Sequence, residues 1–265
     1  TNPSPSVGGT LIVFLLRMLY NISSTYSFNH ELLIHLMGAA TKARFKYFKD
    51  PNDQHQLNQI LSEEVVNRYS NIVNKNILNG IQDFNNDGFG STTHVSVLDK
   101  NGNAASITTT NGESCGHVLP GTGVILNNML GEEDLNPLGF HNWTNSRRLP
   151  TLISPSLILN KNGNVNLVLG SAGSNRIRSA MIQVILNYFI KEMTLEESVY
   201  SPRIHLEKNE LHVEPGINLS KEIIENKNIK INSFSELNLF FGGVNSVSDK
   251  EAVSDPRRGG YGVIC

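Results

Sequence analysis

Two threonines and a histidine, Thr92, Thr93 and His94, directly follow the polar, glycine-rich stretch IQDFNNDGFGS at residues 81–91. Cleavage of the bond between Ser91 and Thr92 gives Thr92 a free α-amine beside its hydroxyl. An α-amine of ordinary pKa, about 7.7–8.0, is partly neutral near pH 7 and can accept the proton of an attacking hydroxyl. The same hydroxyl can attack the Ser91 carbonyl, because small, flexible residues before it let the chain bend. This junction therefore predicts a self-activated nucleophile.

The same threonines also have a purely structural interpretation. Threonine is favoured in strands, and the alternating stretches 93–99 and 103–110, joined by a Lys-Asn-Gly turn, are typical of a β-hairpin. On composition alone, the beginning of a strand is the more common explanation of a Thr-Thr-His sequence. The rest of the chain has to decide between the two.

The surrounding elements predict an α+β architecture. Helical periodicity indicates three early helices, at residues 10–22, 30–48 and 62–74, and a later one at 175–193. Alternation indicates further hairpins at 156–170 and 203–216, then a short helix at 220–226 and C-terminal strands. Helices followed by strands, a long helix and more strands favour a layered α+β fold. We expect residues 81–91 to form an exposed linker.

The composition points to a small-molecule substrate. The formal net charge is -2 over 265 residues, which gives no electrostatic basis for binding nucleic acid or a membrane surface. The apolar run at residues 11–16 is far shorter than the roughly 20 residues of a spanning helix. The two cysteines, Cys115 and Cys265, are expected to be free thiols. A chain that begins at Thr1 within a Pro- and Gly-rich stretch is expected to be the later part of a longer precursor.

An ordered set of motifs resembles the gamma-glutamyltranspeptidase family. STTHVSVLDKNGNAASITTT at 91–110 is similar to the segment that opens the small subunit of those enzymes, which cleave themselves before the first threonine of a Thr-Thr-His motif. The likeness continues through LPGTGVILNN, LISPSLIL, GSAGSNRI and SDPRRGG, and upstream PSPSVGGT is similar to a loop late in the large subunit. The resemblance implies a four-layer αββα N-terminal-nucleophile hydrolase fold. It divides the chain into late large subunit, 1–91, and small subunit, 92–265.

The resemblance also implies the catalytic residues. Thr92 corresponds to the nucleophile, and Thr110, on the partner strand, to the threonine that holds its amine. The family's oxyanion-hole pair falls on Gly173 and Ser174. A Gly-containing turn before a helix N-terminus suits that role, because its amides and the helix dipole can face a developing negative charge. The implied chemistry needs no cofactor and no metal.

The residues that would recognise a glutamyl group match the family less well. The resemblance implies Asn111 for the substrate-binding asparagine, Glu132 or Glu133 for the carboxylate that pairs with the substrate amine, and Thr151 for one of two serines that bind its carboxylate. Met129 stands where the family has an amide or a carboxylate, and Leu152 replaces the second serine. The arginine that binds the same carboxylate belongs to the early large subunit, which this chain lacks.

Three functional hypotheses follow. The first is acyl transfer from a gamma-glutamyl donor such as glutathione to water or an amino acid, with the large and small subunits as partners. The second keeps the Thr92 chemistry for a non-glutamyl acyl amide, because Met129 and Leu152 depart from the family. The third is a catalytically inactive relative or fragment.

Other sequence signals have ordinary structural explanations. DFNNDG at 83–88 matches the start of a calcium loop, but the twelfth position is His94 instead of a glutamate. We interpret His94 as a structural residue and His117 as a surface residue. We do not expect Cys115 to act as a nucleophile. Both arginine pairs, at 147–148 and 257–258, are expected to be solvated.

Overall fold

The computed structural model describes residue 2 and residues 6–22, 28–50, 53–75, 92–136, 138–143 and 146–265. Its helices are α1 Val7–Ile22, α2 His30–Tyr47, α3 Gln54–Ile60, α4 Glu63–Asn74, α5 Arg176–Phe189, α6 Leu195–Tyr200 and α7 Lys221–Ile224. Its strands are β1 Thr92–Leu98, β2 Ala104–Thr110, β3 Ser156–Leu159, β4 Val165–Ala172, β5 Ile204–Glu207, β6 Glu210–Val213, β7 Lys230–Ser233, β8 Gly243–Val247 and β9 Ala252–Val253. Short 3-10 turns lie at η1 Met129–Gly131, η2 Glu133–Leu135, η3 Leu239–Phe241 and η4 Pro256–Arg258.

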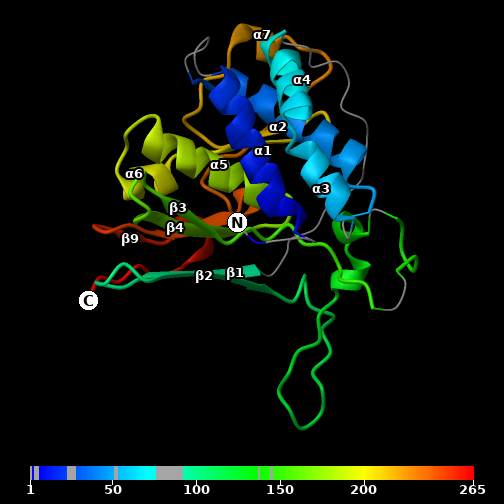
Figure 1. Ribbon diagram of the computed structural model, residues 1–265, viewed down its shortest axis with the longest axis vertical. Coiled ribbons are helices and arrows are strands. Elements are labelled where there is room, and N and C mark those ends of the chain that lie inside the picture. Colours follow the sequence, from blue (N-terminus) through cyan, green and yellow to red (C-terminus); the bar gives the residue numbers. More distant parts are fainter. Residues whose placement is uncertain are drawn as a thin grey trace.

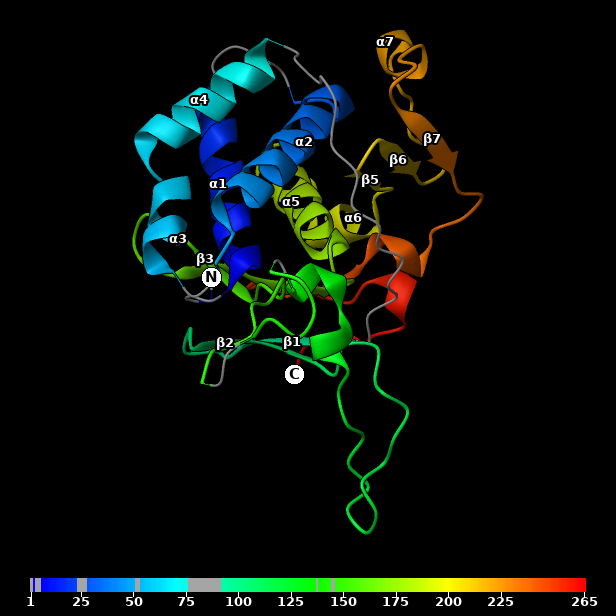
Figure 2. The same cartoon turned by 90° about the vertical axis from the view of Figure 1, so that its right-hand side faces the viewer.

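Three layers are stacked on one another (Figure 1). The helices lie on one side of the four-stranded sheet, whose strand order is β3-β4-β8-β9, and α5 and α6 pack directly on it. The β1-β2 hairpin lies under the opposite face, and the separate sheet β5-β6-β7 stands to one side (Figure 2). The expected α+β class is therefore confirmed. The described residues supply an α layer and two β layers of the expected four-layer sandwich.

The helical layer is held by a continuous apolar core. Leu11, Phe14 and Met18 of α1 are fully buried and pack with α2, α4 and the inner side chains of β5 and β6. A second apolar cluster joins α5 to β4 and β8, with Leu167 and Met181 fully buried. Burial on this scale fixes the helices to the sheet, because each fully buried aliphatic side chain contributes about 1.5–3 kcal/mol.

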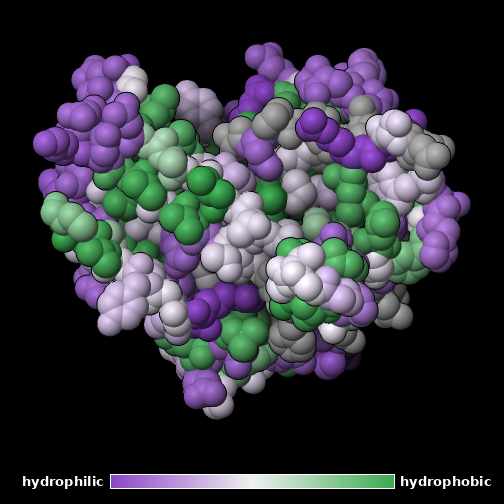
Figure 3. Space-filling view, turned by 90° about the horizontal axis from the view of Figure 1, so that it is seen from below, coloured by the Kyte–Doolittle hydropathy of each residue, from purple (hydrophilic) through white to green (hydrophobic). Residues whose placement is uncertain are grey.

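The outer face of the hairpin is not covered by any helix of the described residues. Val95, Val97 and Ile107 are each at least half exposed there, whereas His94 on the inner face is buried. Viewed from this side, the surface carries hydrophobic groups among polar ones (Figure 3).

Most elements lie where the sequence places them. The hairpins, α2, and α4 with its Ser62 cap agree with expectation, and Ser62 Oγ accepts a hydrogen bond from the Val65 amide. Helix α1 begins three residues before Thr10 and includes Gly8, where a Cβ would lie 2.1 Å from the Leu152 carbonyl oxygen. Helices α3 and α6 were not predicted. The expected linker at 81–91 lies outside the described residues.

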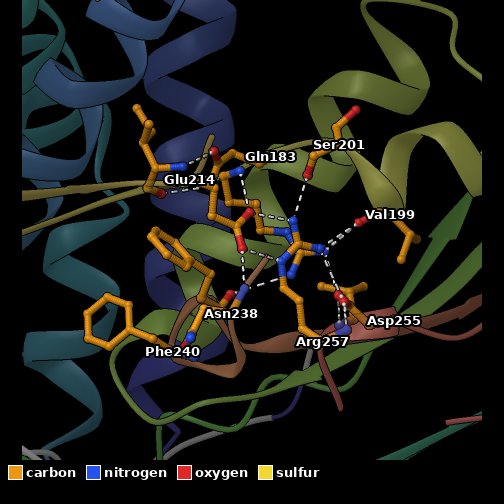
Figure 4. A network of polar contacts seen from close by, with 12 residues as sticks. Gln183, Val199, Ser201, Glu214, Asn238, Phe240, Asp255 and Arg257 are labelled. Carbon is orange, nitrogen blue, oxygen red and sulfur yellow. Dashed lines mark hydrogen bonds and ion pairs between the residues drawn. The ribbon is translucent and has the colours of Figure 1, made fainter. Parts of the chain in front are cut away.

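The arginine pair at 257–258 contradicts the sequence expectation. Arg257 is buried and bonds to Glu214 and Asp255, and Arg203 bonds to Asp255 at 2.6 Å (Figure 4). We call Arg203, Glu214, Asp255 and Arg257 the buried ion cluster. Arg258 is only partly exposed, and its side chain packs against Gly243. The prediction of a solvated pair was therefore wrong. The C-terminal segment folds back onto the protein and places Arg257 between the end of α6 and Glu214, which follows β6.

Candidate active site

Thr92 and Thr110 face each other at the open end of the β1-β2 hairpin. They are direct register partners, and the Thr92 hydroxyl donates to Thr110 Oγ1 at 3.1 Å. Thr110 Oγ1 also accepts a hydrogen bond from the Gly112 amide at 3.0 Å. The two threonines that the sequence assigns to one site are therefore in contact, and the turn after β2 holds the second of them.

His94 anchors this end of the hairpin to the sheet. Its two ring nitrogens lie 2.7 Å from Thr108 Oγ1 and 2.8 Å from Ser96 Oγ. Burial lowers the pKa of His94 to about 4, so the ring is neutral at pH 7. A Cβ at Gly170 of β4 would lie 2.3 Å from this ring, so only glycine allows the close approach. The expectation that His94 is structural is confirmed.

The loop after β2 returns to the same end of the hairpin. The Asn128 amide donates to the Asn111 carbonyl at 3.2 Å, and Asn128 Oδ1 accepts from the Glu113 amide at 2.7 Å. Gly112 lies between this amide and an acidic side chain: a Cβ there would lie 2.3 Å from Asn128 Oδ1 and 2.2 Å from Glu132 Oε1. Sequence reasoning missed Gly112 and Asn128, although Gly112 comes two residues after the motif at 91–110 and Asn128 is the last residue of LPGTGVILNN.

The two candidate carboxylates for substrate recognition differ in their surroundings. Glu133 is exposed, whereas Glu132 Oε1 is buried and has no hydrogen-bond partner among the described residues. Burial, reinforced by the charges of Asp134 and Glu113, raises the pKa of Glu132 to about 7. Glu132 is thus a half-buried acid beside Gly112, with one carboxyl oxygen that has no partner among the described residues. Such a group is a candidate for binding a cation.

The Gly173–Ser174 turn connects β4 to α5 in an unusual backbone conformation. Gly173 has φ 125° and Ser174 has φ 49°, a left-handed value that a side chain disfavours. The carbonyl oxygens of both residues accept hydrogen bonds from Arg176 and Ile177 in the first turn of α5. The Ser174 hydroxyl donates to Asp134 Oδ2 at 3.1 Å. The turn therefore lies at a helix N-terminus, close to the acidic segment that contains Glu132.

Thr151 lies in the same neighbourhood as Asp134. It lines a cavity of about 20 Å³ together with Arg44 and Asp134. Its carbonyl accepts from the Val7 and Gly8 amides, and its hydroxyl accepts from the Ile153 amide at 3.2 Å. Leu152 is buried, and Met129 packs against the helical core. Leu152 is thus enclosed, whereas Met129 remains partly exposed.

The predicted site residues fall into two connected groups. Thr92, Thr110 and Glu132 are linked through Gly112, and Ser174 and Thr151 are linked through Asp134. The segment 132–134 joins the groups. Asn111 is exposed, but its carbonyl is tied to Asn128.

The remaining candidate signals are placed as follows. Ser91 and the calcium-like sequence at 83–88 lie outside the described residues. Cys115 and Cys265 are free and exposed, as expected, and His117 is exposed. Within the described ranges, no group of three or more His, Cys, Asp or Glu side chains is arranged to hold a metal ion. The helices described are all too short or too polar to cross a membrane.

Comparison with known proteins gives consistent matches. A family profile described as gamma-glutamyltranspeptidase matches residues 1–265. The glutathione hydrolase proenzyme of Bacillus subtilis (strain 168) is 27% identical over 99% of this chain and 50% of its own length. The chain thus spans about half the length of the curated relatives it matches.

A solved structure and a relative matched over a shorter stretch extend this result. A gamma-glutamyltranspeptidase from Pseudomonas nitroreducens, complexed with L-DON, superimposes with a TM-score of 0.54 and 26% identity. That match covers 65% of this chain and 99% of the solved chain. An acylase ACY 1 proenzyme from Pseudomonas sp. (strain SE83) is 37% identical over 48% of this chain and 23% of its own length.

Proposed function

Because the chain belongs to the gamma-glutamyltranspeptidase family, we propose that it is an N-terminal-nucleophile acyltransferase and hydrolase that cleaves gamma-glutamyl amides through an ester on Thr92. The observation that carries this proposal is the contact between Thr92 and Thr110, at 3.1 Å, near Glu132, whose Oε1 is buried and has no partner among the described residues. Several names among the relatives, such as glutathione hydrolase, support glutathione-type donors.

The proposed activation is cleavage of the Ser91–Thr92 bond. The Thr92 hydroxyl attacks the Ser91 carbonyl, the amide becomes an ester, and water releases residues 1–91 from the new N-terminus. The extent of the match with the solved Pseudomonas nitroreducens chain supports this boundary. It covers 65% of this chain and nearly all of that one, and residues 92–265 are about two thirds of this chain. Fragments 1–91 and 92–265 would remain partners.

The catalytic cycle uses the same two groups of Thr92. The α-amine takes the hydroxyl proton while the oxygen adds to the amide carbon of the donor. The C–N bond then breaks, the proton passes to the leaving amine, and the acyl group stays on Thr92 as an ester. Water or the amine of an amino acid attacks this ester and regenerates the hydroxyl. This sequence of steps needs no cofactor, and Thr110 keeps the Thr92 side chain in place.

Gly173 and Ser174 are proposed to stabilise the oxyanion that forms in each addition step. Their turn opens α5, so the helix dipole and nearby amides favour negative charge there. Loss of one such donor typically costs about 10²–10³ in rate. Serine at position 174 is compatible with this role, because only the backbone amide is needed.

Glu132, rather than Glu133, is proposed to bind the α-ammonium group of a gamma-glutamyl donor. Its buried carboxylate next to Gly112 gains a counter-ion when substrate binds, whereas Glu133 is already solvated. Thr151 is proposed to face the donor's α-carboxylate, and Asn111 to border the same pocket.

A second candidate substrate class is a non-glutamyl acyl amide. Leu152 removes one hydroxyl and Met129 replaces a polar group in the region that would read the glutamyl group, and the acylase relative shares 37% identity over 128 residues. Both candidates use the same Thr92 ester, so activity on different acyl groups separates them.

The test compares gamma-glutamyl-p-nitroanilide with glutaryl-p-nitroanilide on the full chain. Thr93→Ala is the matched control for Thr92→Ala, because Thr93 is the exposed neighbour on the same strand. We expect turnover of the gamma-glutamyl compound that survives in Thr93→Ala and disappears in Thr92→Ala. Turnover confined to the glutaryl compound would exclude the first substrate class and favour the second. Turnover of neither, in a chain that stays intact, would favour an inactive relative.

A further inference from the structure

Arg44 of α2 reaches from the helical layer to the candidate oxyanion turn. Its side chain is buried, and Nη1 donates to Asn175 Oδ1 at 2.7 Å. Nη2 donates to the Asp134 carbonyl at 2.9 Å and lies 3.8 Å from Asp134 Oδ1. The Arg44 guanidinium thus binds two residues next to Ser174. Asn175 follows Ser174 in the chain, and Asp134 contacts the Ser174 side chain.

Asp134 and Asn175, the two residues that Arg44 binds, hold the Gly173–Ser174 turn in place. Asp134 Oδ2 accepts the Ser174 hydroxyl at 3.1 Å. Asn175 occupies the cap position of α5, yet its side chain makes no cap hydrogen bond. Instead it bridges Arg44 and Glu207, donating to Glu207 Oε1 at 2.7 Å. The side chain of Asn175 is therefore committed to tertiary contacts.

Ser174 has a backbone conformation that needs such support. Its φ of 49° costs a residue with a side chain more than it costs glycine, of the order of 1 kcal/mol. The turn is also confined from behind, because a Cβ on Gly173 would lie 2.8 Å from Gly242 Cα. A turn with these constraints keeps its shape only if the surrounding contacts select it.

We propose that Arg44 is a positioning residue for the reaction: by holding Asp134 and Asn175 together, it sets the direction of the Gly173–Ser174 backbone amides. This inference rests on the proposed function, which assigns oxyanion stabilisation to that turn. Arginine suits the role because its planar fork donates in two fixed directions, whereas a lysine ammonium cannot reproduce both at once.

The position of Arg44 in the chain adds a consequence. We call the contacts of Arg44 with Asp134 and Asn175 the clamp. Arg44 precedes the Ser91–Thr92 bond, whereas Asp134 and Asn175 follow it. The proposed cleavage therefore divides the clamp between two fragments. Arg178 of α5 makes a second such contact, donating to Thr41 Oγ1 of α2 at 3.0 Å. The fragment 92–265 would then need the upstream fragment for full activity.

The experiment measures kcat and KM for gamma-glutamyl-p-nitroanilide in Arg44→Met and Arg44→Lys. Arg147, an exposed arginine paired with Asp50 at 2.6 Å, supplies the matched controls Arg147→Met and Arg147→Lys. We expect Arg44→Met to lower kcat by about 10², the effect of losing an oxyanion donor, with KM within about threefold. Arg44→Lys should recover part of this loss, and both Arg147 variants should match the unsubstituted chain.

Asn175→Ala removes the hydrogen bond between Arg44 and Asn175 by changing the acceptor. This variant tests the proposal if Arg44→Met does not fold. We expect a similar fall in kcat, and a double variant no slower than the worse single variant, because both break one connection. A lower Tm with unchanged kcat in both variants would overturn the proposal.

Failure of the proposed function is distinguishable from failure of this inference. If the unsubstituted chain shows no Thr92-dependent turnover, the function fails, and the crystal structure of Arg44→Met still tests the clamp. A displaced Gly173–Ser174 turn would support the clamp in that case, and an unchanged turn would overturn it.

Discussion

Buried carboxylates occur in two regions of this molecule, and they are treated in opposite ways. In the buried ion cluster, Glu214 accepts from Arg257 and from the Arg203 and Asn238 amides, and Asp255 bonds to both arginines and two backbone amides. Burial alone would raise the pKa of Asp255, but the charges of Arg203 and Arg257 more than offset it. In the candidate site, Glu132 Oε1 has no partner among the described residues, and its pKa rises to about 7.

This difference distinguishes carboxylates that are paired within the protein from a carboxylate that is available to bind a ligand. A buried charge whose bonding capacity is filled within the protein gives shape to the chain around it. A buried charge left without a partner costs free energy, and that cost is recovered only when something binds. We therefore assign the cluster to stability and propose Glu132 for substrate recognition.

The largest expected effect is the loss of the nucleophile. Thr92→Ala should lower kcat by at least about 10⁴, because removing a nucleophile leaves only binding and oxyanion stabilisation. Thr92→Ser, which keeps the hydroxyl, should retain measurable turnover. Steady-state kinetics measures kcat for both variants. Equal activity of Thr92→Ala and the unsubstituted chain would show that Thr92 is not the nucleophile.

The next effect concerns stability. Arg257→Met should reduce the free energy of unfolding by about 3–5 kcal/mol, because it leaves Glu214 buried without its guanidinium partner and removes one of the two arginines that bond to Asp255. Urea unfolding followed by circular dichroism measures this change. The folded fraction should keep its KM. A change below about 1 kcal/mol would show that the cluster is not the structural element that its hydrogen bonds indicate.

Glu132→Gln should produce the opposite pattern, with binding lost and stability kept. KM for gamma-glutamyl-p-nitroanilide should rise by about 30-fold or more, because a buried charge pair with the substrate ammonium is lost. A change in kcat with KM unaltered would contradict a recognition role. Glu133→Gln, at the exposed neighbour, is the control and should leave KM unchanged.

The pH dependence of the same variant sharpens the comparison. The folded-state pKa of Glu132, about 7, lies above the ordinary value of 4.5, so its contribution to stability is present below pH 4.5 and lost as the pH rises through 7. Above pH 7 Glu132→Gln should therefore unfold at the same or a higher temperature than the unsubstituted chain. In the latter, KM should fall as the pH rises through about 7, and in the variant this fall should be absent.

The sequence was sufficient for local features of the site. Alternation and turn chemistry predicted the hairpin, the resemblance assigned Thr92 and Thr110 to one site, and the register pairs the two residues. The capping box of α6, Thr194 with Glu197, was readable in the sequence and was overlooked. Local chemistry of this kind depends on residues close together in the chain, so it can be recognised there.

Other features depend on residues far apart in the chain and could not be predicted. Nothing in the adjacent letters of Glu132 and Glu133 says which one faces Gly112. Two neighbouring arginines at 257–258 look solvated until the tail is found against Glu214. The contact of Arg44 with Asn175 joins residues 131 positions apart. Tertiary packing decided each of these cases.

Mass spectrometry of the purified chain tests the central claim most directly, because the proposed chemistry requires Thr92 to be an N-terminus. The account predicts two fragments that separate between Ser91 and Thr92, and a single intact chain for Thr92→Ala. An intact unsubstituted chain that still turns over substrate, or cleavage that persists in Thr92→Ala, would contradict it.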